Sequence, residues 1–122
     1  MILVDTHIFL WALSAPEKIS SENLIEIQTL ANTIYISSVS VAEIMIKTSL
    51  NKLDIPFDPI EMVEKSGFEF LDFSAKDAVL LREMPYHHKD PFDRMLIAQS
   101  IANKFYIMSS DRKFKLYDCK LI

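Results

Sequence analysis

Residues 91–109, PFDRMLIAQSIANKFYIMS, decide the fold class. The first part, 91–104, is apolar on nearly every side of a helix, which predicts a helix buried within the protein. Pro91 suits the first position of that helix. The last part, 105–109, is a short apolar run that predicts a strand buried on both faces. A long helix leading directly into such a strand is typical of an α/β protein with a parallel sheet.

The rest of the chain repeats this alternation of short apolar runs and helix-like segments. Strands are also predicted at 1–4, 33–37 and 68–73, and the tail 115–122 is a candidate for one more. Helices are predicted at 6–13, 20–31, 40–50, 58–66 and 75–84. No repeat, low-complexity tract or linker interrupts this pattern. The 122 residues therefore predict one domain over 1–122, a three-layer α/β/α fold around a mostly parallel sheet.

The scarcity of two residue types excludes several kinds of site. The single cysteine, Cys119, leaves no partner for a disulfide and no cysteine-based zinc site within the chain. The single glycine, Gly67, excludes the glycine-rich loops of Walker and Rossmann nucleotide sites. Gly67 is instead placed to end the helix predicted at 58–66.

The charge balance bears on possible partners and on location. A net charge of −4 argues against a protein held on nucleic acid by charge alone. It does not exclude a nuclease, because acids that bind a metal ion count against the net charge. The apolar start of the chain is interrupted by Asp5 and His7 and makes a poor signal peptide. No segment approaches the roughly 20 apolar residues of a membrane span, so we expect a cytoplasmic protein without a membrane anchor.

Four acidic residues fall where the predicted strands end. Asp5 directly follows the strand 1–4, and Asp111 follows the strand 105–109 after one further residue. Glu43 is expected in the first turn of the helix that follows the strand 33–37. Asp93 is expected in the first turn of the helix 91–104, which runs back before the next strand and so begins at the same edge of the sheet. Open α/β sheets bind ligands at this edge, and we expect the four carboxylates to meet there.

Each acid alone has a second interpretation as a helix cap. Asp90 fits an N-cap with Asp93 three residues later, near the positive end of the helix dipole. Ser40 and Glu43 fit a capping box, and Asp5 could cap its own helix. For any single acid, capping is the simpler explanation.

The set of four is harder to explain by capping. Several carboxylates brought together in a partly buried cleft repel one another, and some protonate unless a cation neutralises them. A hard divalent ion with oxygen ligands resolves this repulsion. Mg²⁺ or Mn²⁺ suits such a site better than zinc, for which no histidine or cysteine set is present.

Histidines and basic residues lie near the same edge in sequence. His87 and His88, with Lys89, could contact phosphate, but a solvated loop is the favoured interpretation. A modest basic rim suited to phosphate contact is formed by Arg94, Arg112, Lys113 and Lys115. A plain solvated face explains this rim almost as well.

The motifs around the four acids resemble those of the PIN-domain ribonucleases, and among them the VapC-type toxins of prokaryotic toxin–antitoxin pairs. LVDTHIFLWAL is similar to the opening strand with the first acid, and ISSVSVAEIMIKTSLNKL to the segment with the second. HKDPFDRMLIAQS is similar to the segment with the third acid, taken as Asp93 rather than Asp90. SSDRKFKLYD is similar to the closing segment, with Ser109 at a position that is often threonine. The resemblance covers essentially the whole chain.

This resemblance implies a metal-dependent endoribonuclease with a PIN-like fold. The implied metal ligands and catalytic residues are Asp5, Glu43, Asp93 and Asp111, holding Mg²⁺ or Mn²⁺. The implied substrate-binding residues are Thr6, Arg94, Ser109 and Arg112. The resemblance also implies an RNA substrate, a homodimer and a VapB-type antitoxin that covers the acidic cleft. The sequence does not identify the RNA.

Two other classes of function remain open from the sequence. A receiver-like signalling domain would bind Mg²⁺ and accept a phosphoryl group, with Asp72 at a strand end as the acceptor. That class has adjacent acids after its first strand, whereas Thr6 and His7 follow Asp5 here. A catalytically silent PIN module would only bind a partner, and the presence of all four acids argues against it.

Overall fold

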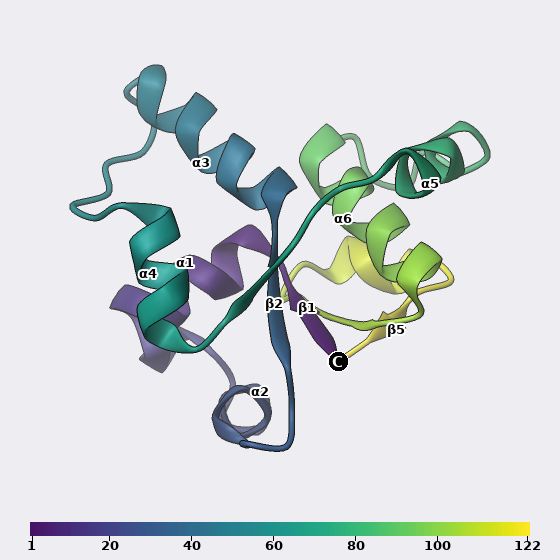
Figure 1. Cartoon of the computed structure of the whole chain (residues 1–122). Coiled ribbons are helices and arrows are strands. Elements are labelled where there is room, and N and C mark those ends of the chain that lie inside the picture. The colour runs from purple at the N-terminus through teal and green to yellow at the C-terminus, as the bar shows by residue number, and fades with distance from the viewer.

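A five-stranded parallel sheet lies between two groups of helices in the computed structural model, which describes residues 1–122 (Figure 1). The strands are β1 (Ile2–Val4), β2 (Ile34–Ser37), β3 (Glu69–Leu71), β4 (Tyr106–Met108) and β5 (Lys120–Leu121). Their order in the sheet is β3-β2-β1-β4-β5, and every neighbouring pair is parallel. The predicted α/β fold with a central parallel sheet is confirmed.

The helices cover both faces of the sheet. The α-helices are α1 (Thr6–Ser14), α2 (Ser21–Gln28), α3 (Ser38–Ser49), α4 (Pro59–Ser66), α5 (Ala75–Ala78) and α6 (Pro91–Asn103). Three 3-10 helices are η1 (Pro16–Lys18), η2 (Val79–Arg82) and η3 (Arg112–Leu116). Figure 1 shows α1 and α4 on one side of the strands and α5 and α6 on the other. None of these helices has the length and apolar character that crossing a bilayer requires.

Alternate residues of the central strand β1 pack into two separate hydrophobic cores. Ile2 and Val4 belong to the core that contains Phe9 of α1. Leu3 belongs to the core that contains Ile97 of α6. Side chains of a strand alternate between the two faces of a sheet, so a strand covered on both faces is apolar at every position. The unbroken apolar run at the start of the chain reflects this double burial.

The sheet topology places the site. Val4 of β1 pairs with Ile36 of β2 on one side and with Met108 of β4 on the other. The three strands therefore end at the same edge, followed by Asp5 after β1 and Ser109 after β4. The chain leaves β1 towards β2, whereas β4 lies on the other side of β1. Parallel α/β sheets bind ligands at such a change of direction.

One predicted helix is largely replaced by other structure. Residues 75–84 form the short α5 and then the 3-10 helix η2. Pro85 has no N–H to bond to the carbonyl of Leu81, which an α-helix through this point would need. The Arg94 guanidinium approaches the carbonyls of Leu81 and Met84 instead, at 3.4 and 3.3 Å. Arg94, a residue of α6, therefore donates hydrogen bonds to carbonyls that would accept backbone N–H groups in a longer helix.

Candidate active site

Asp5 lies directly after β1, is buried, and begins α1. Its side chain is 3% exposed and accepts a hydrogen bond of 2.8 Å from the backbone N–H of Ile8, so the capping interpretation is correct. Burial nevertheless raises the pKa of the Asp5 carboxyl, although hydrogen bonds from Ser109 and Ile8 oppose the shift. A buried carboxylate whose charge is disfavoured is suited to holding a cation.

Glu43 lies beside Asp5 but is not a capping residue. The helix α3 begins at Ser38, and Ser37 caps it through the N–H of Val39. The predicted capping box between Ser40 and Glu43 is therefore wrong, and Glu43 lies in the second turn. Its carboxylate is buried, and its Oε1 lies 2.7 Å from the hydroxyl of Thr6.

Thr6 is a buried residue whose hydroxyl contacts side chains of α3. These are the carboxylate of Glu43 and, at 2.8 Å, the hydroxyl of Ser40. These contacts link the start of α1 to α3. The contact of Thr6 with substrate stays a prediction.

Asp93 lies in the first turn of α6, as predicted. Asp90 caps the helix by accepting hydrogen bonds from the N–H groups of Phe92 and Asp93. Burial and then the charge of Asp90 raise the pKa of Asp93 to about 7, although His88 opposes the rise. The charge of Asp5 adds to the rise. The two carboxylates therefore lie close enough for the charge of Asp5 to affect the pKa of Asp93.

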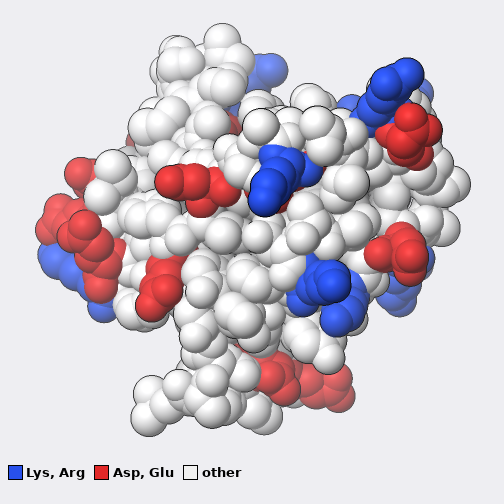
Figure 2. Space-filling view, turned by 45° about the vertical axis from the view of Figure 1, so that its right-hand side comes forward, with Lys and Arg blue, Asp and Glu red and all other residues white.

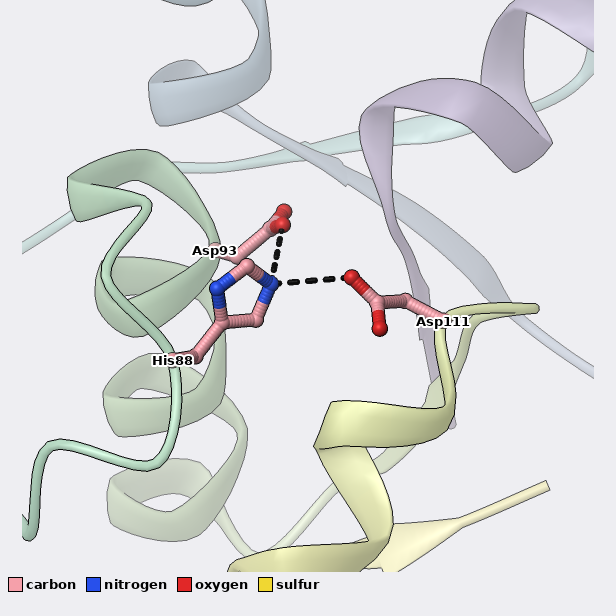
Figure 3. Close-up of side chains that lie close together, drawn as sticks. All are labelled: His88, Asp93 and Asp111. Carbon is pink, nitrogen blue, oxygen red and sulfur yellow. Dashed lines mark hydrogen bonds and ion pairs between the residues drawn. The ribbon is translucent and has the colours of Figure 1, made fainter.

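His88 joins the acids, contrary to the solvated loop expected for it. The residue is 7% exposed. Its Nε2 lies 2.9 Å from Oδ2 of Asp93 and 2.9 Å from Oδ2 of Asp111 (Figure 3). The burial depends on a ring of neighbours that come from distant parts of the chain. The one feature of the neighbouring sequence that could have pointed to a place for His88 near the acids is its position two residues before the helix cap at Asp90.

Asp111 follows β4 and begins η3. Its Oδ1 accepts a hydrogen bond of 2.9 Å from the N–H of Lys113, and its own N–H donates to the hydroxyl of Ser109 at 3.0 Å. Burial acts to raise the pKa of Asp111, but the bonds from Lys113 and His88 outweigh it and the pKa is lowered. Ser109 is buried between Asp111 and Asp5, so its hydroxyl supports both acids from within the protein.

Lys47 adds a positive charge beside the acidic residues, and no motif in the sequence indicates this role. Its ammonium lies 2.5 Å from Oε2 of Glu43, one turn earlier on α3. This hydrogen bond is the largest of the effects that raise the pKa of Lys47, and the charges of Asp90 and Asp93 raise it further. Lys47 therefore neutralises part of the acidic cluster.

The basic rim divides into one buried arginine and several exposed side chains. Arg94 is 5% exposed, and its guanidinium donates to the carbonyl of Pro85 at 2.7 Å and lies 3.9 Å from the ring centre of Tyr86. Its donors therefore face the protein interior, and its contact with substrate stays a prediction. Arg112 is exposed on η3, next to Asp111. Figure 2 shows the lysine and arginine side chains of one face as separate groups rather than a continuous patch.

The donor set fits a hard divalent cation. Three carboxylates from separate elements, Asp5, Asp93 and Asp111, offer the oxygen ligands that Mg²⁺ and Mn²⁺ prefer. One ligand atom from each of His88, Asp93 and Asp111 lies within 4.8 Å of the others. The raised pKa of Asp5 and that of Asp93 show that charge is disfavoured there without a cation.

The fold and this site define an α/β protein with a carboxylate cluster at the switch point of its sheet. A profile of the PIN domain matches residues 2–119, and the chain therefore belongs to the PIN domain family, which is a family of nucleases. A search of curated protein sequences finds no match.

Solved structures share the fold over the full length of the chain. The crystal structure of VapBC2 from Rickettsia felis bound to a promoter DNA fragment contains a chain with a TM-score of 0.70 and 22% identity, covering 100% of this chain and 98% of that one. A chain of FitAcB from Neisseria gonorrhoeae has a TM-score of 0.68 and 18% sequence identity, with 100% of this chain and 96% of that one covered. A chain of DNA-bound VapBC from Salmonella typhimurium has a TM-score of 0.68 and 18% sequence identity, with 99% of this chain and 96% of that one covered.

Proposed function

We propose that the protein is a Mg²⁺- or Mn²⁺-dependent endoribonuclease that acts as the toxin of a toxin–antitoxin pair. One observation carries this proposal. The buried Asp5 and the half-buried Asp93 both have raised pKa values, mainly because of burial, and the charge of Glu43 adds to the rise at each of them. Together with membership of a nuclease family, this arrangement favours phosphodiester hydrolysis.

Asp5, Asp93 and Asp111 would hold the ion, with Glu43 beside them. A bound divalent ion polarises a phosphodiester and lowers the pKa of a coordinated water. The protein's own part is to hold the acids at fixed positions. Asp5 is fixed by the N–H of Ile8, Glu43 by Thr6, and Asp111 by the N–H of Lys113.

Arg112 is the proposed substrate contact. It is exposed on the same 3-10 helix that Asp111 caps, and Lys113 and Lys115 are exposed on this helix as well. Positive side chains beside a carboxylate site can receive the phosphates that flank the cleaved bond. RNA is the proposed substrate because the sequence motifs resemble those of ribonucleases.

A VapB-type antitoxin is the proposed partner. The similar solved structures include VapBC complexes from Rickettsia felis and Salmonella typhimurium and a toxin–antitoxin complex from Klebsiella pneumoniae. A homodimer and a cytoplasmic location are proposed on the same resemblance. The receiver-like alternative is less well supported, because Asp72 is exposed and follows the edge strand β3, away from the central strands that carry the cluster.

Cleavage of structured RNA by the purified protein tests the proposal. We expect cleavage with Mg²⁺ or Mn²⁺, no cleavage in EDTA, and no cleavage by Asp5→Asn or Asp93→Asn. Asp72→Asn is a matched control, because it makes the same chemical change at an exposed acid. Cleavage that persists in EDTA, or in Asp93→Asn, would contradict the proposal. Stable phosphorylation of Asp72 by a small phosphodonor would favour the receiver alternative.

A further inference from the structure

We propose that His88 is a positioning residue that holds Asp93 and Asp111 through a proton on its Nε2, and that it is not itself a metal ligand. This inference rests on the proposed metal-dependent function and adds a residue that the acid motif does not contain. His88 lies between Asp93, which belongs to α6, and Asp111, which caps η3 (Figure 3).

The orientation of the imidazole ring follows from its two nitrogens. The backbone N–H of Asp90 donates to Nδ1 of His88 at 3.2 Å. Since Nδ1 is an acceptor, a neutral ring carries its single proton on Nε2. That nitrogen hydrogen-bonds to Asp111 and lies equally close to Asp93, at 2.9 Å from each. The Nε2 proton thus points at the pair of carboxylates.

The same geometry argues against Nε2 as a metal ligand. The atoms of His88, Asp93 and Asp111 are close enough together for one ion to touch all three. A neutral imidazole that coordinates through Nε2 must carry its proton on Nδ1. That proton would face the N–H of Asp90, donor against donor. The Asp90 backbone has little freedom to turn away, because its side chain caps the first turn of α6.

His88 is itself held firmly in place. Its backbone N–H donates to the hydroxyl of Tyr117 at 2.9 Å. That hydroxyl donates in turn to the carbonyl of Pro85 at 2.8 Å. The ring meets Phe114 edge to face, with 6.1 Å between the centroids. A buried ring held by these contacts can act as a rigid spacer between two carboxylates.

The effect of this spacer falls on metal binding. Two like charges brought together repel, and a shared hydrogen-bond donor offsets the repulsion while fixing their separation. Residues that orient metal ligands typically contribute 10- to 100-fold to metal affinity. Loss of the Nε2 donor is therefore expected to weaken Mg²⁺ binding by about 10-fold or more.

Nitrogen NMR of the histidine rings in the full-length protein tests the proton position directly. In the metal-free protein at neutral pH, we expect His88 to carry its proton on Nε2 and none on Nδ1, with the exposed His7 as an internal reference. On titration with Mg²⁺, the Nε2 proton should remain. A proton on Nδ1 of His88, before or after Mg²⁺ is added, would overturn the inference.

Two substitutions separate the donor from the ring. Glutamine places an amide N–H₂ near the position of Nε2, whereas asparagine reaches only the position of Nδ1. We expect the Mg²⁺ dissociation constant, measured calorimetrically without RNA, to rise about 10-fold or more in His88→Asn. His88→Gln should recover most of the affinity. Equal weakening in both variants, or none in either, would overturn the inference.

The failure of this inference and that of the proposed function give different results. If the wild type does not bind Mg²⁺, the metal-dependent function fails, while the ring NMR still decides whether His88 donates from Nε2. If the wild type binds Mg²⁺ but Nε2 loses its proton on binding, only the positioning role fails. The NMR measurement needs no substitution, so a variant that does not fold leaves the test intact.

Discussion

Lys47 donates a hydrogen bond to Glu43 across one turn of α3, and its charge also acts on Asp90 and Asp93. The Glu43 side chain in this pair is 3% exposed, whereas that of Lys47 is 37% exposed. The protein therefore supplies a cation of its own, the Lys47 ammonium group, at the border of the acidic cluster. Lys47 stabilises the cluster without a metal and also competes with one electrostatically.

Lys47→Met should destabilise the metal-free protein, because it leaves Glu43 buried with only Thr6 as a partner. We expect a loss of about 1–3 kcal/mol in the free energy of unfolding, measured by urea denaturation at pH 7.5 in EDTA. The matched control is Lys65→Met, which removes the same i,i+4 pair with Glu61 where both side chains are more than half exposed. That change should stay within about 0.5 kcal/mol. Equal losses in the two variants would show that Lys47 has no special role.

The same substitution should strengthen divalent-ion binding. Removal of a positive charge beside a cation site lowers the electrostatic penalty for the incoming ion. Calorimetric titration with Mg²⁺ should therefore give a lower dissociation constant for Lys47→Met than for the wild type. An unchanged dissociation constant would mean that the ion binds too far from Lys47 for the lysine charge to affect its affinity.

Stability without metal should fall as the pH rises towards neutrality. Burial raises the pKa of Asp93 to about 7, so the folded protein holds a proton there that the unfolded chain releases near pH 4. Between about pH 4 and 7 the unfolded state binds fewer protons at this position, and the free energy of unfolding decreases with pH. Urea denaturation in EDTA should show this decrease in the wild type and a smaller one in Asp93→Asn. Identical slopes for the two proteins would contradict the burial argument.

The two arginines of the predicted rim should behave in opposite ways. Arg94→Met removes donors to carbonyls and to Tyr117 within the protein, and we expect it to lower the free energy of unfolding by about 1–3 kcal/mol, because buried acceptors are left without partners. Arg112→Met changes an exposed side chain and should stay within about 0.5 kcal/mol while raising KM for RNA. A stable Arg94→Met protein with a raised KM would contradict this expectation and support the assignment of Arg94 to substrate binding.

The sequence predicted most of the fold because its signals are local and periodic. The strands β1, β2 and β4 read as continuous apolar runs because both of their faces are buried. The helix α6 is recognised from its start at Pro91 and its many buried residues. The cap at Asp90 and the helix end at Gly67, with φ 78°, follow from short-range backbone chemistry.

The errors concern contacts between distant segments. The shortened helix at 75–84 depends on Arg94, which lies later in the chain. The start of α3 at Ser38 moves Glu43 out of the first turn and breaks the predicted capping box. His88 was expected in solvent because its partners, Asp111 and Tyr117, are more than 20 residues away. The convergence of the acids was predictable from topology, but the groups that hold them were not.

The central claim is that the carboxylates of Asp5, Asp93 and Asp111 bind a divalent ion at the edge of the sheet. Calorimetric titration of the wild type and of Asp93→Asn with Mn²⁺, with Asp72→Asn as control, tests it most directly. We predict saturable binding by the wild type and Asp72→Asn, and a loss of affinity of at least about 10-fold in Asp93→Asn. Equal Mn²⁺ affinity in all three proteins, or no binding by any of them, would contradict the account.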